Sequence, residues 1–355
     1  MAGEQMSPEP VTDQRTPTAD HEPLTAVSDL SERELIARIQ RRLPPPPDWM
    51  AVGIGDDAAV VEPERNRLDV LSVDALVEGV HFDRRFTPPD AIGHRALAVN
   101  LSDLAAMGAT PRLCLLSLVL PGNWPVADFE AMLDDLLALA ARHRIHVAGG
   151  NLARSPGPIV IDITVSGTIK RRQIATRTGA SAGDELYVTG SIGAAAAGLE
   201  MLREGGASSS PCATRYLYPE PRVRIGQLVA RNRVASACVD LSDGLADAVH
   251  RLAEASGLGA IVDDDALPIE PSARDWFEQH ASDPSQRAIT GGDDYELLLA
   301  VSPRARRRLS QVTRHAGTPL TRVGVCTADR SVLLRCGRDT SKQDKPLPGG
   351  YGHFR

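Results

Sequence analysis

Residues 90–120, DAIGHRALAVNLSDLAAMGATPRLCLLSLVL, indicate the fold class of this chain. The first part carries apolar side chains at helical spacing and predicts a helix over residues 90–107. The second part, Leu113–Leu120, is a nearly continuous apolar run of the length typical of a buried strand. Because a helix passes directly into a strand here, and both kinds of segment recur along the chain, the sequence predicts a mixed α/β (α+β) fold.

Helix and strand signals alternate on both sides of this stretch. Ser31 and Glu34 form a capping box that opens a helix, which ends before Pro44–Pro47. Further helices are predicted over Val126–Arg142, Ile192–Arg203, Arg222–Arg231 and Gly244–Ser256. Short strands are predicted over Ala58–Val61, Leu68–Val73, Ile145–Val147, Ile159–Thr168, Glu185–Val188, Ala235–Val239, Ala260–Val262, Leu297–Val301 and Arg322–Val325.

The length of 355 residues suits two domains of roughly 100–200 residues each. Residues 1–26 hold five acidic side chains against Arg15, together with four prolines, which predicts a disordered tail. The basic patch Lys170–Arg172 and the loop after it mark the expected boundary between the domains. We therefore predict an N-terminal domain over residues 27–170 and a C-terminal α/β domain over residues 171–355.

The formal net charge is −7, and the 39 basic side chains include only three lysines: Lys170, Lys342 and Lys345. This balance argues against a general nucleic-acid binder, which needs a cationic face. It also disfavours a nucleotide enzyme built around a catalytic lysine. No apolar run approaches the roughly 20 residues of a membrane span, and five cysteines without CxxC spacing indicate a reducing compartment. We expect a cytoplasmic protein with no nucleic-acid or membrane partner.

Short acidic motifs border several of the apolar runs. A single aspartate at such a position is more often a turn residue or a helix cap. Paired acids, however, repel one another unless a cation lies between them. Mg²⁺ prefers oxygen ligands and shares its sites with substrate phosphates, so the motifs together predict magnesium-dependent phosphate chemistry. They are Gly53–Asp57 (GIGDD), Ser72–Asp74 (SVD), Asn100–Asp103 (NLSD), Asp240–Gly244 (DLSDG) and Gly291–Glu296 (GGDDYE).

Several polar residues have two interpretations that the sequence leaves open. Ser242 or Asp243 either caps the following helix or binds a phosphate at its N-terminus. His81 is either an ordinary surface or core side chain, or a contact to phosphate or substrate. Arg177 is either a solvated charge or a clamp on a transferring phosphate.

Several well-known catalytic patterns are missing from the sequence. It contains no GxxxxGK[ST] loop, no protein-kinase VAIK or HRD pattern, no GxSxG and no His/Cys cluster typical of zinc. Phosphoryl transfer depends mainly on positioning and charge neutralisation. With so few lysines, several Mg²⁺ ions are expected to supply that neutralisation.

The longer motifs resemble those of thiamine-monophosphate kinase, in the order of that family and over about residues 30–355. The resemblance implies a two-domain aminoimidazole ribonucleotide synthetase-like fold and a homodimer in which N-terminal strands of two chains form a shared barrel. It also implies phosphorylation of thiamine monophosphate by ATP to thiamine diphosphate, by direct in-line transfer assisted by several Mg²⁺ ions. The matching segments are Gly53–Val60, Ser72–Phe82, Ala96–Pro111, Asp240–Leu245, Gly291–Leu297 and Gly350–Phe354.

The same resemblance implies roles for individual residues. Asp74, Asp103 and Asp243 are the expected catalytic residues. The metal ligands are expected to be Asp57, Ser72, Val73, Asp74, Asp103, Asn151, Asp240 and Asp243. The ATP contacts are expected to be Gly150, Arg177 and Ser242, and the contacts to thiamine monophosphate His81, Asp293 and Tyr351.

The sequence departs from the family pattern at four positions. Val73 stands where the family often has a threonine that also contacts metal. Asn151 replaces an aspartate of the Gly-Gly-Asp motif and brings no charge, which predicts a weaker metal site. Asp293 replaces a longer glutamate, and Tyr351 is the nearest candidate for an aromatic contact to thiamine because Pro348 replaces the usual aromatic residue.

Two alternatives to the thiamine-monophosphate kinase function stay open: another ATP-using member of the same superfamily, or a non-catalytic nucleotide- and metal-binding relative. The hydrogenase maturation relative is disfavoured because no cysteine follows Cys336. Selenophosphate synthetase is disfavoured because no reactive cysteine or selenocysteine is evident near the N-terminus.

Overall fold

The computed structural model describes residues 25–337 and 344–350. The predicted tail therefore lies mostly outside the described residues, and so does Tyr351. Thr25 and Ala26, which were assigned to the tail, pair with the folded body instead: Thr25 O accepts a hydrogen bond from Val126 N at 2.8 Å, and Ala26 forms a bridge with Pro125.

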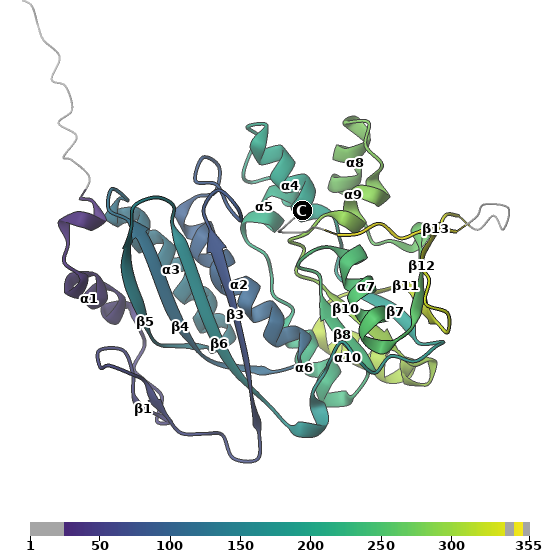
Figure 1. The fold of residues 1–355 in the computed structure, drawn as a ribbon, viewed down its shortest axis with the longest axis horizontal. Helices are drawn as coiled ribbons and strands as arrows, with labels where there is room; N and C mark the ends of the chain where they lie inside the picture. The colour runs from purple at the N-terminus through teal and green to yellow at the C-terminus, as the bar shows by residue number, and fades with distance from the viewer. Residues whose placement is uncertain (1–24, 338–343, 351–355) are drawn as a thin grey trace, which may run out of the picture.

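A four-stranded sheet forms the centre of the first half of the structure (Figure 1). Its strand order is β3 (Leu68–Val77), β6 (Val160–Ile169), β4 (Thr110–Pro121) and β5 (His146–Ser155). Only β4 and β5 are parallel. One face of the sheet is covered by α2 (Pro89–Ala106) and α3 (Val126–His143).

The other face of this sheet is open within the described residues. Leu71, Val73 and Leu115 point out of it with exposed fractions of 71%, 54% and 40%. Exposed apolar side chains gathered on one sheet face are unusual for a monomer and are typical of an interaction surface. At the edge of this face lie α1 (Glu32–Arg42) and the short strands β1 (Met50–Val52) and β2 (Val60–Val61). The capping box expected at Ser31 and Glu34 is present.

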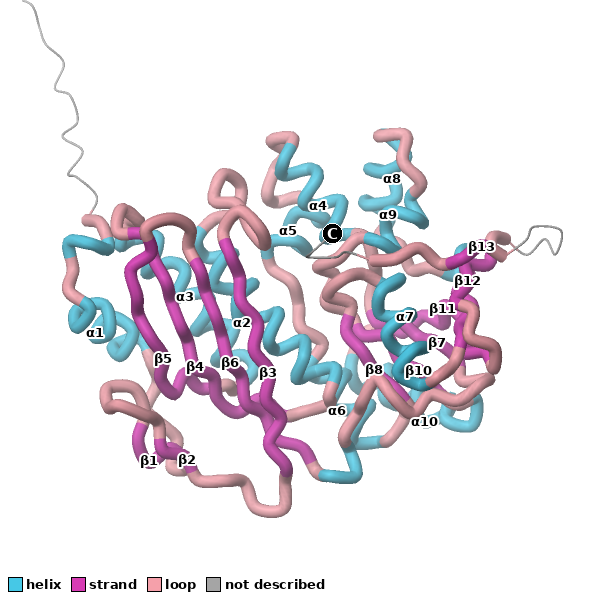
Figure 2. Tube along the Cα trace, viewed as in Figure 1, coloured by secondary structure: helices cyan, strands magenta, loops and turns pink. Residues whose placement is uncertain are grey.

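A seven-stranded sheet forms the second half (Figure 2), in the order β13-β12-β9-β11-β7-β10-β8. The strands are β7 (Glu185–Thr189), β8 (Ala237–Asp240), β9 (Gly259–Asp263), β10 (Leu297–Val301), β11 (Leu320–Thr327), β12 (Val332–Arg335) and β13 (Lys345–Pro346). The helices are α4 (Ala194–Arg203), α5 (Pro211–Leu217), α6 (Val223–Asn232), α7 (Leu245–Ser256), α8 (Pro271–Gln279), α9 (Pro284–Thr290) and α10 (Arg306–Ala316). None of the helices in the described residues has the length and apolar character needed to cross a bilayer.

The mixed α/β class is confirmed, but some predicted boundaries were wrong. The strand expected to end at Gly149–Gly150 continues to Ser155, with a bulge where Leu115 pairs with Gly149. Gly150 allows this close pairing because a Cβ there would lie 1.9 Å from Leu116 O. The strand predicted over Leu68–Val73 runs on to Val77, because β6 pairs with it along its full length.

Candidate functional site

A cavity of about 720 Å³ lies between α2 and β3 on one side and the loops of the second half on the other; we call it the central cavity. Two acidic motifs form its second wall. The backbone N–H of Asp293 donates to Ser242 O at 2.8 Å, and that of Tyr295 donates to Leu241 O at 3.1 Å. The motifs at 240–244 and 291–296, far apart in sequence, are therefore held side by side. The predicted site residues that line this cavity are Asp74, His81, Asp103, Arg177, Asp240, Ser242, Asp243 and Asp293.

Helix α2 connects the first wall of the central cavity to the second. Ser72 Oγ on β3 donates to Asp103 on α2. Ser102 Oγ donates to Asp240 Oδ2 at 2.8 Å, which links α2 to the end of β8. Asn100 Oδ1 accepts from the backbone N–H of Asp74 at 3.0 Å. These hydrogen bonds bring carboxylates from β3, α2 and β8 to one place.

The carboxylates of this cluster raise one another's pKa values. Burial, followed by the charges of Asp103, Asp240, Asp243 and Asp162, raises the pKa of Asp74 to about 7, although the side chain is open to the cavity. Burial and the charge of Asp103 raise the pKa of Asp240 to about 6. The protein therefore holds several acids in a place where their charged forms are unfavourable without a cation.

The donor set of the cluster fits Mg²⁺, although no metal site is preformed. Among the described residues, no three His, Cys, Asp or Glu side chains converge closely enough to hold a metal ion by themselves. Mg²⁺ commonly uses one or two carboxylates and takes its remaining ligands from water and substrate phosphates. Asp243 is already paired with Arg251 at 2.8 Å, so that ion pair would have to open or be shared.

Added Mg²⁺ is expected to stabilise this protein more at about pH 8 than at about pH 5. Because the folded pKa values of Asp74 and Asp240 exceed the ordinary 3.8, the folded state binds more protons than the unfolded state between about pH 4 and 7. The protonated carboxyl groups of Asp74 and Asp240 therefore stabilise the metal-free fold at low pH, and this stabilisation is lost as the pH rises through this range. Mg²⁺ needs the deprotonated carboxylates, so its effect grows with pH. Melting temperatures with MgCl₂ or with a chelator measure this, and an equal gain at both pH values would contradict it.

Asp293 and His81 line the same cavity as the acidic cluster. Asp293 has the left-handed φ of 69°, which is uncommon for a residue other than glycine. Its Oδ1 accepts from the Tyr295 hydroxyl at 3.0 Å. Nδ1 of His81 accepts from the backbone N–H of Val77 at 3.0 Å, so a neutral His81 carries its proton on Nε2.

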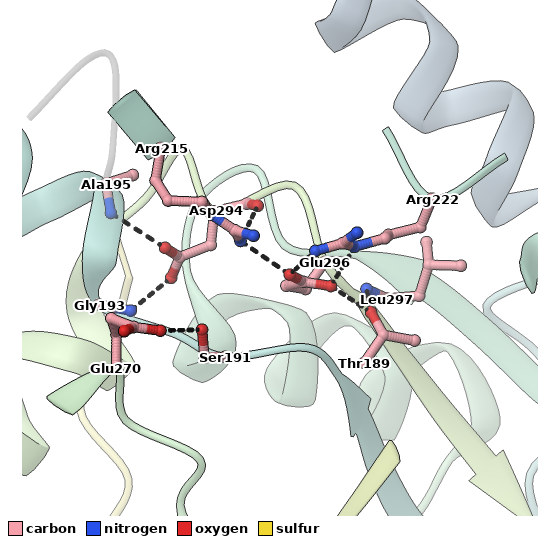
Figure 3. A network of polar contacts seen from close by, with 10 residues as sticks. All are labelled: Thr189, Ser191, Gly193, Ala195, Arg215, Arg222, Glu270, Asp294, Glu296 and Leu297. Atoms are coloured by element: carbon pink, nitrogen blue, oxygen red, sulfur yellow. Dashed lines mark hydrogen bonds and ion pairs between the residues drawn. The ribbon is translucent and has the colours of Figure 1, made fainter. Parts of the chain in front are cut away.

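The segment that carries Asp293 is fixed from behind by buried acids (Figure 3). Asp294 accepts from the backbone N–H of Gly193 at 2.8 Å and of Ala195 at 3.2 Å, and so caps the start of α4. Glu296 is fully buried between Arg215, Arg222 and Thr189. These two acids of the GGDDYE motif are therefore structural, whereas Asp293 faces the cavity.

A second cavity of about 1120 Å³, the N-terminal cavity, holds three of the remaining predicted residues; Ser72 and Val73 on β3 line neither cavity. It lies between α1, the loop 53–59 and β5, and it is lined by Asp57, Gly150 and Asn151. These residues are not brought into the central cavity. Successive side chains of β3 point to opposite faces of the sheet, and the two cavities lie on these two faces. Asp74 pairs with buried Ile163, whereas Val73 pairs with Thr164, which lines the N-terminal cavity. The Val73 side chain is thus on the opposite face from Asp74.

Asp162 lies between the residues of the N-terminal cavity and those of the central cavity. It is not among the residues predicted from the sequence. It lines the N-terminal cavity, and its charge contributes to the raised pKa of Asp74. The available signal was a single acid within the otherwise uncharged and mostly apolar residues 159–165. Asn100 and Ser102 belong to the NLSD motif but were given no role of their own, because their complete burial within α2 is visible only in the structure.

Two family models match the chain in order. The model for the N-terminal domain of AIR synthase related proteins matches residues 55–169, and the model for their C-terminal domain matches residues 181–336. With the two sheets and the acidic cavity between them, these matches define the class: a two-domain AIR synthase related protein.

Relatives narrow the class further. Thiamine-monophosphate kinase of Bacillus subtilis (strain 168) is 34% identical, over 86% of this chain and 94% of that protein. The crystal structure of thiamine-monophosphate kinase from Stenotrophomonas maltophilia K279a is 37% identical and superposes with a TM-score of 0.77, over 86% of this chain and 96% of that one. AaThiL complexed with AMPPCP and TMP is 30% identical with a TM-score of 0.72, over 85% and 92%. The chain belongs to the thiamine-monophosphate kinase family.

Proposed function

We propose that this protein transfers the γ-phosphoryl group of ATP to thiamine monophosphate, giving ADP and thiamine diphosphate. The observation that carries the proposal is the carboxylate cluster of the central cavity, in a chain whose relatives are thiamine-monophosphate kinases. The solved relative with AMPPCP and TMP supports the same pair of substrates. We place the enzyme in the cytoplasm, in keeping with four buried free cysteines in the described residues.

We propose a direct in-line transfer within the central cavity. The bond between the γ-phosphorus and the ADP oxygen breaks as a phosphate oxygen of thiamine monophosphate bonds to that phosphorus, and ADP leaves. Asp74, Asp103, Asp240 and Asp243, with Ser72, would hold several Mg²⁺ ions, which when bound neutralise charge on the phosphates. Ser242 and Arg177 would contact ATP, and His81 and Asp293 would contact the acceptor. No phosphorylated protein side chain is required.

We further propose that Asp57 and Asn151 of the N-terminal cavity are metal ligands, that Gly150 contacts ATP there, and that the enzyme is a homodimer. A second copy packed on the open sheet face would cover the exposed side chains of Leu71, Val73 and Leu115. The predicted domain limits of 27–170 and 171–355 belong to the same proposal. Sedimentation of the protein, with Leu71→Glu as a variant expected to dissociate it, tests the dimer.

The test of the reaction is an assay with ATP, MgCl₂ and either thiamine monophosphate or thiamine as acceptor. Thiamine diphosphate is expected only from the monophosphate. If the protein binds ATP but forms no product from either acceptor, it is instead a non-catalytic nucleotide-binding relative.

Replacing Asn151 by aspartate is expected to lower the Mg²⁺ concentration needed for half-maximal rate. The amide of Asn151 offers a neutral oxygen, whereas a carboxylate adds charge to a metal site. A several-fold decrease is the expected size, measured from rate against MgCl₂ at saturating ATP. Asn232→Asp, at an exposed position at the end of α6, is the control. An unchanged Mg²⁺ curve for Asn151→Asp would remove this residue from the metal site.

A further inference from the structure

Arg95 is a buried cation that the proposed reaction does not yet use. It lies on α2, its exposed fraction is 1%, and it is among the largest fully buried side chains of the described residues. Burying a guanidinium is costly unless its charge is paired and its donors are bonded. Its Nε has no hydrogen-bond acceptor among the described residues. A cation that is retained at this cost and not fully satisfied suggests a role beyond packing.

The contacts of Arg95 come from both halves of the chain. Its Nη2 lies 3.3 Å from Asp293 Oδ1 and 3.5 Å from the carbonyl oxygen of His81. Its Nη1 donates to the carbonyl oxygen of Tyr216 on α5, and its guanidinium lies over the Tyr216 ring at 4.3 Å from the centroid. The Tyr216 hydroxyl donates to the same His81 carbonyl at 3.4 Å. One guanidinium therefore joins the loop after β3 to the GGDDYE loop.

We infer that Arg95 is a positioning residue that sets the distance and orientation between His81 and Asp293. The inference rests on the proposed function, in which these two residues contact the acceptor. Arg95 itself is behind the cavity wall and is not among the residues that line the cavity. Its charge compensates the Asp293 carboxylate, which has an uncommon left-handed backbone. Both Arg95 and the Tyr295 hydroxyl bind Oδ1, which leaves Oδ2 of Asp293 for the acceptor.

The planar fork of arginine explains why lysine is not an equivalent residue here. A guanidinium presents several donors in fixed directions, so it can bind Asp293, His81 and Tyr216 together. A lysine ammonium keeps the positive charge but is a compact point donor on a flexible stem. Arg95→Lys therefore preserves the charge and removes the geometry, which separates positioning from simple charge compensation.

Arg95→Lys is expected to raise KM for thiamine monophosphate about tenfold, with KM for ATP within about twofold of the wild type. Calorimetric titration of thiamine monophosphate without ATP is expected to show the same loss of affinity. Tyr218→Phe is the matched control, because it removes a hydrogen bond of 2.6 Å between the Tyr218 hydroxyl and Asp90 on α2 without touching the cavity. Both KM values of this control are expected to stay unchanged.

A double-mutant cycle with Asp293→Asn completes the test. If Arg95 acts through Asp293, the losses in acceptor affinity from the two single variants will be less than additive. Additive losses, an equal rise of both KM values, or unchanged acceptor binding in the folded Arg95→Lys protein would each overturn the inference. If Arg95→Lys does not fold, Arg95→Gln takes its place, because it keeps a planar donor group but loses the charge and the fork: a rise confined to the acceptor KM supports the inference, and no rise overturns it. Failure of the wild-type protein to bind or phosphorylate thiamine monophosphate would instead refute the proposed function.

Discussion

Replacing Asp74 by asparagine is expected to lower kcat about 10²–10³-fold without destabilising the fold. Asp74 faces the central cavity, and its neighbours Asp103, Asp240 and Asp243 all disfavour its charge. A side chain that contributed only to stability would not be kept in such surroundings. Removal of the charge relieves repulsion in the metal-free protein, so the melting temperature of Asp74→Asn at about pH 8 should equal or slightly exceed that of the wild type.

Two measurements decide this expectation: the turnover with ATP and thiamine monophosphate, and the melting temperature with a chelator. Asp275→Asn, the same change at an exposed position on α8, is the control and should alter neither. Full activity of Asp74→Asn would exclude Asp74 from the catalytic cluster. A large fall in melting temperature would show that the carboxylate stabilises the fold instead.

The fold was predictable where the apolar pattern is long. The helix and strand within residues 90–120 are α2 and β4, and the next predicted helix is α3. The helices missed in the second half include three that begin with proline: α5, α8 and α9. Proline suits the first turn of a helix because its missing N–H has no partner there. Ser210 and Asp283 cap two of these helices, so a start signal was present in the sequence but was not used.

The site was predictable in its residue types but not in its arrangement. Period-two alternation places Ser72 and Asp74 on one face of a strand and Val73 on the other. Which face meets α2 depends on packing that no local pattern records. The contact between the DLSDG segment and the GGDDYE loop similarly depends on the pairing of β8 with β10, where Asp240 is opposite Leu297. The separation of Asn151 from the central cavity depends likewise on the pairing of β5 with β4, where Asn151 is opposite Ser117.

The largest effect on stability is expected from Glu296→Ala. Glu296 has no exposed surface, and its carboxylate accepts hydrogen bonds from Arg215 at 2.7 Å, Arg222 at 2.5 and 2.6 Å, and Thr189 Oγ1 at 2.6 Å. Removing one partner of a buried ion pair leaves the remaining charges unpaired, which costs about 3–5 kcal/mol. Here two arginines lose their partner at once, so the upper part of that range is expected for the fall in the free energy of unfolding.

Denaturant unfolding of Glu296→Ala, Glu296→Gln and Glu278→Ala distinguishes this network from general sensitivity to substitution. Glu278 is exposed on α8, so its removal should change stability by less than about 0.5 kcal/mol. Glu296→Gln keeps the size and one acceptor oxygen but loses the charge, and should be intermediate. Gly190 packs directly against this carboxylate, because a Cβ at Gly190 would lie 2.2 Å from Glu296 Oε1. Equal stability of Glu296→Ala and Glu278→Ala would contradict this expectation. It would mean that Arg215 and Arg222 reach solvent or new partners, and that the Glu296 network does not hold the Asp293 loop in place.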